Sequence, residues 1–255
     1  HSCTPALLHS CTPALLHSAL IPVARSVTAL AWSVNGQRLF SGDSGGLVAC
    51  SEVDFFQHST TSRVVVQASG HPVVWLDYRL KTLMVNTAAS CFLLREGKRM
   101  EVGSRARAGL YGGALLQAGV GEGGLLAVSV RPGNRLWVAE AVSGKVGSTL
   151  VLGEALAAHH TQIPLINPTN IVAEEATTSP LLKVAVLSEA RQELVVWHGS
   201  GLHIVSLTKE AVVASCSSLR GVQDVSITDS GEIFVLESGR SLVRLAEKED
   251  RYWKP

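Results

Sequence analysis

The stretch of sequence that decides the fold is VTALAWSVNGQRLFSGDSGGLVACS, residues 27–51. It contains three short apolar runs, at Val27–Trp32, Arg38–Gly42 and Leu47–Ser51, and the gaps between them are rich in Gly, Asn, Asp and Ser. Runs of this length with such boundaries are typical of antiparallel strands joined by hairpins. With a fourth run at Arg63–Gln67, the stretch predicts a four-stranded sheet of the kind that forms one blade of a β-propeller.

The two gaps predict the turns of this blade. Asn35-Gly36 predicts a tight hairpin turn, because both residues tolerate positive φ at the central positions. Asp43–Gly46 predicts the turn between the second and third strands, where Gly and Asp are common.

The same order of runs recurs along the chain. Further runs lie at Val73–Tyr78, Thr82–Val85, Cys91–Leu94 and Met100–Val102, then at Tyr111–Leu116, Leu125–Val130, Asn134–Ala139 and Thr149–Leu152, then at Lys183–Leu187, Glu193–Trp197, Leu202–Leu207 and Val212–Cys216, and finally at Val222–Ile227, Glu232–Leu236 and Ser241–Leu245. Val73 follows Val27 by 46 residues, and Val222 follows Lys183 by 39. These periods fit the roughly 40–45 residues of a WD repeat, so we predict an all-β fold, a WD40-type β-propeller.

Two segments do not fit the blade pattern. Residues 1–18 contain the octamer HSCTPALL twice in succession and then the start of a third copy, so we treat them as low-complexity sequence outside the fold. The polar stretch 153–180 is predicted to be a loop insertion between blades, or a boundary between two smaller β domains. Residues 19–255 then form the propeller region. We expect this propeller to be incomplete, with four to five blades of a seven-bladed ring and the missing blades on the N-terminal side.

Composition excludes several classes of function. The 22 Lys and Arg balance 21 Asp and Glu, and no basic block is present, so we expect no nucleic-acid partner. No apolar run approaches the roughly 20 residues that a membrane-spanning helix needs. The five cysteines include no CxxC pair and no Cys/His cluster with zinc spacing, so we predict neither a disulfide framework nor a metal site.

One motif resembles catalytic chemistry. Gly42-Asp43-Ser44-Gly45-Gly46 is similar to the nucleophile loop of chymotrypsin-type serine proteases, and Leu156-Ala157-Ala158-His159-His160 is similar to the segment that carries the general base. In those enzymes, however, the histidine precedes the serine, whereas here His159 follows Ser44 by 115 residues. A serine hydrolase using Ser44 therefore remains only a remote alternative, and we interpret the motif as a hairpin turn of a non-enzymatic protein.

The remaining candidate residues have structural interpretations. The adjacent pair His159-His160 has no second ligand pair nearby, so we assign it to a loop. Gly119–Gly124 lacks the Lys-Ser/Thr of a phosphate-binding loop and is predicted to be a turn. Four tryptophans are expected at corresponding core positions of several blades; they are Trp32, Trp75, Trp137 and Trp197. We predict no catalytic, cofactor-binding or metal-binding residue, and no cofactor.

Several segments resemble one family of proteins. They are Ser26–Ser33, Asn35-Gly36, Leu39–Asp43, Val74–Tyr78, Arg131–Trp137 and Trp197–Ile204. These segments are similar to the WD-repeat region of the tectonin β-propeller repeat-containing protein family, and the resemblance extends over most of residues 26–245. The Hermansky–Pudlak syndrome 5 protein family shares the Leu-Asp-Tyr and Arg-Pro-Gly-x-Arg-x-Trp signatures less closely. The octamers and residues 153–180 depart from both families.

The resemblance implies a cytoplasmic, non-catalytic scaffold that binds proteins of autophagy and secretory or endolysosomal trafficking, at ER exit sites or endolysosomal membranes. Membrane association would be peripheral and mediated by partners. The second family implies an alternative, a subunit of a complex for the biogenesis of lysosome-related organelles. The Atg8-interacting motif and tectonin repeats of the first family have no counterpart here, so we expect no Atg8 binding by that route.

Overall fold

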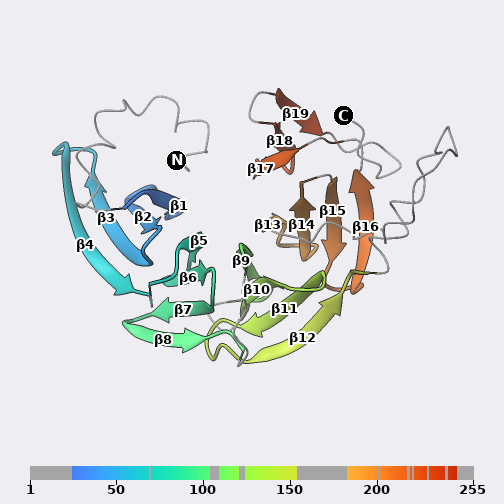
Figure 1. The fold of residues 1–255 in the computed structure, drawn as a ribbon, viewed down its shortest axis with the longest axis horizontal. Coiled ribbons are helices and arrows are strands. Elements are labelled where there is room, and N and C mark those ends of the chain that lie inside the picture. Colours follow the sequence, from blue (N-terminus) through green and yellow to red (C-terminus); the bar gives the residue numbers. More distant parts are fainter. Residues whose placement is uncertain are drawn as a thin grey trace, which may run out of the picture. The chain divides into compact units, whose positions relative to one another are not determined.

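The protein is described here from a computed structural model (Figure 1). The structure describes residues 25–245 except 69, 104–108, 121–123, 154–182, 200, 217–218, 220, 229 and 239–240. In this part of the chain, nineteen β-strands form five antiparallel sheets in sequence order, four with four strands and the last with three. The chain thus contains five β-propeller blades, as the repeating runs predict. The number of blades in a parent propeller stays a prediction.

Each blade is a simple meander of neighbouring strands. The strands are β1 (Val27–Trp32), β2 (Arg38–Asp43), β3 (Leu47–Asp54), β4 (Ser59–Gln67); β5 (Val73–Arg79), β6 (Thr82–Thr87), β7 (Cys91–Arg95), β8 (Lys98–Glu101); β9 (Gly113–Gln117), β10 (Leu125–Arg131), β11 (Arg135–Glu140), β12 (Val146–Val151); β13 (Lys183–Ser188), β14 (Glu193–His198), β15 (Gly201–Ser206), β16 (Ala211–Cys216); β17 (Val222–Ile227), β18 (Ile233–Glu237) and β19 (Ser241–Leu245). Every run identified in the sequence corresponds to one of these strands.

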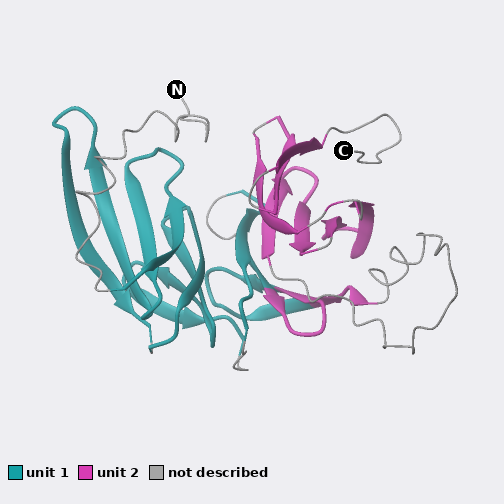
Figure 2. Cartoon of the chain, turned by 45° about the horizontal axis from the view of Figure 1, so that its top comes forward, with its two compact units in different colours: residues 1–129, 138–148 teal, residues 130–137, 149–255 magenta. Residues whose placement is uncertain are grey.

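The chain divides into two compact units (Figure 2). Unit 1 comprises residues 1–129 and 138–148, and unit 2 comprises residues 130–137 and 149–255. The predicted octamer segment 1–18 and almost all of the predicted insertion 153–180, with His159 and His160, lie outside the described residues. The described residues contain no helix that is long and apolar enough to cross a membrane.

Two apolar clusters hold the blades of unit 1 together. The first joins blades 1 and 2 through side chains such as Phe40, Val48 and Phe92, and the second joins blades 2 and 3 through Met84 and Leu115. Burying a side chain of this size contributes about 1.5–3 kcal/mol. Alternation along the strands sends successive side chains to opposite faces, so the middle sheet, blade 2, supplies residues to both clusters.

Polar side chains add specific links between adjacent blades. Thr28 Oγ1 donates a hydrogen bond to the backbone oxygen of Val73 at 2.6 Å, which joins β1 to β5. Asp77 Oδ2 accepts a hydrogen bond from the backbone N–H of Leu115 at 2.7 Å, which joins β5 to β9. Asp77 is partly buried in the blade interior, and this desolvation raises the pKa of its carboxyl group, although the Leu115 N–H opposes the shift.

Unit 2 has its own core. All residues of β14 and β15 are buried, including Trp197, whose ring is among the largest fully buried side chains. Lys183 Nζ donates to the backbone oxygen of Gln223 at 3.2 Å and lies 3.7 Å from Asp224 Oδ1, which links β13 to β17.

Two sequence-based expectations about local structure are wrong. The tryptophans do not occupy corresponding positions, because Trp32 and Trp75 lie on first strands, Trp197 on the second strand of its blade and Trp137 on a third strand. Of these four tryptophans, only Trp197 is fully buried, and the Trp137 ring instead stacks with the guanidinium of Arg131 at 3.9 Å.

The β1–β2 connection is also larger than the predicted two-residue turn. It spans residues 33–37, and only Gly36 has positive φ, at 69°. Ser33 closes the loop, because its backbone N–H donates to the Arg38 oxygen at 2.8 Å. Asn35 accepts hydrogen bonds through its side chain from the Ser33 hydroxyl and the Gln37 N–H, a role that needs no positive φ.

Candidate interaction surface

The protease-like motif forms the β2–β3 turn, as predicted. Asp43 ends β2, and its buried Oδ1 accepts hydrogen bonds from the backbone N–H groups of Gly45 and Leu47, both at 2.8 Å. Gly46 has a φ of 87°, and a Cβ there would lie 2.7 Å from the backbone oxygen of His71. Asp and Gly are therefore required by the turn itself. Among the described residues, the Ser44 hydroxyl makes no hydrogen bond to a histidine.

Histidines do meet elsewhere, in the core of unit 2. His198 and His203 are both 1% exposed, with Nε2 atoms 3.2 Å apart, and His203 Nδ1 lies 2.8 Å from the Ser215 hydroxyl. One ring must donate to the other. Within the described part of the chain, no group of three or more His, Cys, Asp or Glu side chains is arranged to hold a metal ion. The sequence reasoning missed this pair, because only strand register brings His198 and His203 together.

The described cysteines Cys50, Cys91 and Cys216 are buried free thiols. Burial, with a contribution from nearby Glu52, raises the pKa of Cys50 and favours its neutral form.

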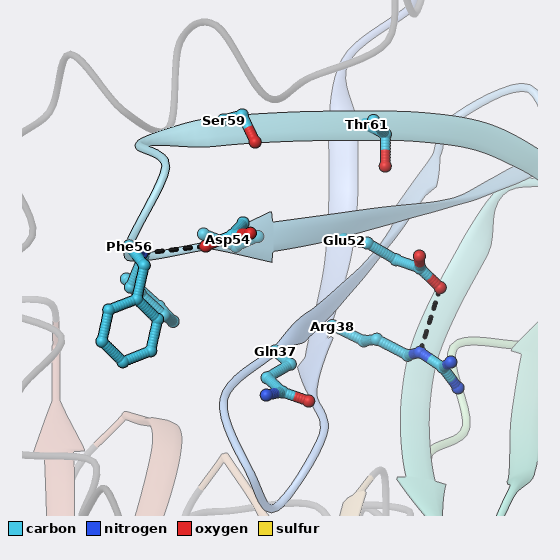
Figure 3. A pocket seen from close by; sticks show the side chains of 9 residues that line it. Gln37, Arg38, Glu52, Asp54, Phe56, Ser59 and Thr61 are labelled. Atoms are coloured by element: carbon cyan, nitrogen blue, oxygen red, sulfur yellow. Dashed lines mark hydrogen bonds and ion pairs between the residues drawn. The ribbon is translucent and has the colours of Figure 1, made fainter.

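A surface pocket of about 470 Å³ lies at one end of blade 1 (Figure 3). It is lined by Gln37, Arg38, Glu52, Val53, Asp54, Phe55, Phe56, Ser59 and Thr61. Asp54 Oδ1 accepts hydrogen bonds from the backbone N–H groups of Phe56 and Gln57, at 2.9 and 3.0 Å, and thereby fixes the β3–β4 turn. Figure 3 shows the Phe56 ring projecting beyond the end of β3.

An ion pair between neighbouring strands lines this pocket. Arg38 Nε lies 3.2 Å from Glu52 Oε1, and Arg38 Nη1 donates to the Tyr78 hydroxyl of blade 2 at 3.5 Å. The hydrogen bond to Tyr78, assisted by Glu52, raises the pKa of Arg38, so its side chain stays cationic. The pocket thus combines two aromatic rings with one paired charge, an arrangement suited to an apolar side chain carrying one polar group.

The pocket belongs to a larger set of turns at one end of unit 1. Thr28 contacts Val73 near the starts of β1 and β5, whereas Arg38, beyond the end of β1, contacts Tyr78 near the end of β5. These first strands therefore run in the same direction. A Cβ on Gly113 would meet Asn86, and Leu115 bonds to Asp77, so β9 also runs parallel to β5.

Because β1, β5 and β9 run the same way, the β1–β2, β3–β4, β5–β6, β7–β8, β9–β10 and β11–β12 turns lie at one end of their sheets. We call the described residues of these turns the turn face. All of these turns except β7–β8 expose large apolar side chains; the residues are Val34, Phe55, Phe56, Leu80, Val120 and Val142, with exposed fractions of 74%, 50%, 99%, 43%, 104% and 48%. At the opposite end of the same blades, the described connections expose only Leu110.

The turn face was not identified from the sequence. The signal was present, since Phe55-Phe56 and Leu80-Lys81 stand where hairpins normally carry Asn, Gly or Asp. Of the predicted turn at Gly119–Gly124, the described residues Gly119, Val120 and Gly124 lie between β9 and β10, where the Ala118 N–H donates to the Gly124 oxygen.

Known structures share the fold but little sequence. The chain aligns over 90% of its length with the WD40 β-propeller domain of Doa1, at a TM-score of 0.61 and 10% identity, covering 67% of that domain. It also aligns over 92% with a chain of the mitotic checkpoint complex, at a TM-score of 0.62 and 14% identity, covering 64% of that chain. Saccharomyces cerevisiae Sqt1 aligns over 92% of the chain at a TM-score of 0.63 and 11% identity, and the alignment covers 64% of Sqt1. These likenesses support the WD40-type propeller fold alone.

Similarity in sequence extends to longer proteins, although no family model matches the sequence. Human Tectonin beta-propeller repeat-containing protein 2 is 29% identical over 88% of the chain, which spans only 16% of that protein's length. WD repeat-containing protein CG11141 of Drosophila melanogaster is 28% identical over 86% of the chain, which spans 35% of it. Human BLOC-2 complex member HPS5 is 26% identical over 83% of the chain, which spans 20% of that protein's length.

These similarities agree with the resemblance deduced from the sequence, including the weaker place of the HPS5 proteins. The described residues form five propeller blades, and six of their exposed large apolar side chains lie on the turns at one end of unit 1. By sequence and by fold, the chain is therefore similar to WD-repeat propeller proteins, with Tectonin beta-propeller repeat-containing protein 2 among its relatives.

Proposed function

We propose that this chain is a non-catalytic scaffold that binds other proteins through exposed turns of its propeller blades. The observation that carries the proposal is the turn face, because exposed Phe, Leu and Val side chains gathered on one surface are characteristic of protein-binding sites. The similarity to WD-repeat proteins supports the same function. A propeller blade is well suited to it, since its rigid sheets hold the turns in place.

We further propose a role in autophagy and secretory trafficking, at ER exit sites, in the cytoplasm. The support is the 29% identity to Tectonin beta-propeller repeat-containing protein 2 over 88% of the chain. The alternative is membership of a complex related to BLOC-2, which the 26% identity to human BLOC-2 complex member HPS5 favours.

One experiment separates these two roles. The tagged chain is expressed in human cells, and its co-purification with HPS5-containing BLOC-2 is compared with its co-localisation with ER exit-site markers. Enrichment at exit sites without BLOC-2 supports the trafficking role, and stoichiometric BLOC-2 supports the alternative. Recovery of neither, with the chain folded and soluble, would overturn both roles.

Hydrolysis by Ser44 is tested in parallel. A fluorophosphonate probe labels activated serines, so we expect no labelling of the wild-type chain and no change in protein binding with Ser44→Ala. Labelling that Ser44→Ala abolishes would restore the hydrolase alternative.

A further inference from the structure

We propose that the turn face of unit 1 binds an amphipathic helix of a partner protein, through an uncharged apolar stripe on that helix. This inference rests on the proposed scaffold function and adds the site and the chemistry of the partner. The residues that make the contact are those exposed on the turn face, with the pocket beside Phe55 and Phe56 as the anchoring point.

The first argument is that apolar residues are retained where the turns themselves disfavour them. Leu80 and Lys81 form the two-residue β5–β6 turn with φ values of 44° and 62°. Such turns strongly prefer Asn-Gly, because a leucine at positive φ carries steric strain. The neighbouring β7–β8 turn has the same two-residue form but uses Glu96 and Gly97, with φ values of 49° and 76°, so its second residue carries no side chain to strain. Leu80 thus adds strain and exposes apolar surface, so a role outside the turn explains it better than folding does.

The second argument concerns charge. Among the described residues of the turns, the charged side chains are Lys81, Glu96 and Lys145, and they carry both signs. Nearby, Arg38 is paired with Glu52. The strand ends beside these turns add Asp54, Arg79, Arg95, Lys98 and Glu140, so charges of both signs border the apolar residues. Mixed charges of this kind do not form the one-sign basic patch that selects anionic lipids or nucleic acid. The complement of the turn face is an apolar protein surface of low charge.

The third argument concerns the backbone. The turns already satisfy their own main-chain groups: Gly36 N–H donates to Ser33, Ala118 N–H to Gly124, and Ser143 N–H to Glu140. An extended peptide needs free edge groups to add as a strand, and this end of the sheets presents side chains instead. A helix bonds its own backbone internally, so it buries an apolar stripe without leaving unpaired N–H or C=O groups.

The edge strand β4 is the competing surface, and its features disfavour strand addition. Its pairing with β3 shifts register between Val48 and Ala49, which leaves Val65 as a bulge. Arg63, with a side chain 72% exposed, stands on the same strand. Bulges and charges are the devices by which edge strands avoid pairing with other chains.

The pocket defines what the helix presents at its anchor. A volume of about 470 Å³ accommodates a large side chain, and Phe55 and Phe56 are among the residues that line it. The Arg38–Glu52 pair provides both donors and an acceptor to a polar tip. We therefore expect Trp, Tyr or Leu at the anchoring position of the stripe.

The test uses a photo-crosslinking amino acid, p-benzoylphenylalanine, placed at Phe56 in the full chain expressed in human cells. The control places it at Ser44, at the opposite end of the same blade. Crosslinked segments are sequenced by mass spectrometry, and the segment captured at Phe56 is synthesised as a peptide. We expect this peptide to carry apolar residues every three to four positions, without charges on that stripe. We also expect it to be captured at least tenfold less from the Ser44 position.

Binding of the peptide then tests the residues. The combined variant Val34→Ser, Phe56→Ser and Leu80→Asn should weaken binding about tenfold or more, while the control Leu110→Ser leaves it unchanged. Thermal unfolding checks that both variants fold. Helical circular dichroism of the peptide should increase on binding.

Three results would overturn the inference: a captured segment that is charged or binds in extended form, binding unaffected by the combined variant, or equal capture at Ser44. A vesicle flotation assay with phosphatidylcholine and phosphatidylserine provides a further check. If the chain floats with the vesicles and Phe56 is needed for this, the turn face binds membranes and the inference is overturned. If the combined variant still co-purifies with the trafficking partners, the inference fails and the scaffold function stands. If the wild-type chain recovers no protein, the scaffold function itself fails.

Discussion

The two ends of the blades in unit 1 differ in how their turns are built. At the β2–β3 end, Asp43 is buried and caps its turn with two short hydrogen bonds, and Gly46 packs against the chain that follows β4. At the β3–β4 end, Asp54 makes the same type of cap in an exposed turn, and Phe56 extends into solvent. One end is therefore optimised for packing, whereas the turn face leaves apolar surface free.

Unit 2 supports this distinction. Its corresponding turns lie at residues 189–192, 207–210 and 228–232, and the described residues there expose no large apolar side chain. Instead they carry charged and polar groups such as Arg191 and Lys209. Exposed apolar turns are thus a property of unit 1 and not a general consequence of the blade meander.

The largest expected effect comes from replacing one turn glycine by alanine at each end of the blades of unit 1. Gly46→Ala should destabilise the protein by about 3 kcal/mol, because its φ is strained for alanine and the new Cβ meets the backbone. Gly97→Ala, at a similar φ of 76° but in open space, should cost only about 1 kcal/mol. Urea unfolding of both variants measures the difference. Equal losses would show that the two ends are packed alike.

Removing the two turn caps should give the next largest effect. Asp43→Ala leaves two enclosed N–H groups without an acceptor and should cost about 2 kcal/mol. Asp54→Ala exposes its N–H groups to water, so it should cost about 0.5 kcal/mol or less. Thermal unfolding distinguishes the two. A larger loss for Asp54→Ala would contradict the contrast between the ends.

Correcting the strained turn should stabilise the protein. Lys81→Gly removes a positive φ from a residue with a side chain and should add about 0.5–1 kcal/mol to the free energy of unfolding. The matched control is Lys145→Gly, in a turn residue without positive φ, which should not stabilise. A Lys81→Gly variant that is no more stable than wild type would remove the strain argument for the turn face.

The smallest effect is a change in pH dependence, at a residue between the two ends. Burial raises the pKa of Asp77 in the folded state, so the folded protein holds this proton to a higher pH than the unfolded chain does. Stability should therefore fall as pH rises from the unfolded value of about 3.9 through the raised folded pKa. Asp77→Asn keeps an acceptor for the Leu115 N–H and removes this dependence. Urea midpoints across that range test it, and parallel curves for both proteins would contradict the assignment.

Much of the fold was predictable because its signals are local. β-branched runs with two-residue alternation and Gly-rich boundaries identify strands without knowledge of their neighbours, and even the weakly marked run at Tyr111–Leu116 corresponds to β9. The Asp43–Gly46 turn was likewise readable, since its residues are required by its own geometry. The tight turn predicted from Asn35-Gly36 was wrong, because side-chain hydrogen bonds of Asn35 support a longer loop.

The candidate site was much less predictable. Phe55 and Phe56 look like Phe92 in a list of residues, yet Phe92 is fully buried between blades and Phe56 is 99% exposed. Burial depends on which neighbouring sheet covers a position, and that contact joins residues far apart in the sequence. His198 and His203 are close in sequence, but their contact depended on the register of the β14–β15 hairpin, which the sequence pattern did not specify.

The sequence by itself determined the number and order of the strands, the all-β class and the turn chemistry of the Gly-Asp-Ser-Gly-Gly motif, because hydrophobic periodicity and backbone preference act over a few residues. Only the tertiary structure decided that the turns after β1, β3, β5, β9 and β11 share one end of unit 1 and leave their apolar side chains uncovered. The parallel direction of β1, β5 and β9 follows from contacts between blades, such as Thr28 with Val73 and Asp77 with Leu115. Such contacts are set by packing across the whole unit, and no local stretch of sequence encodes them.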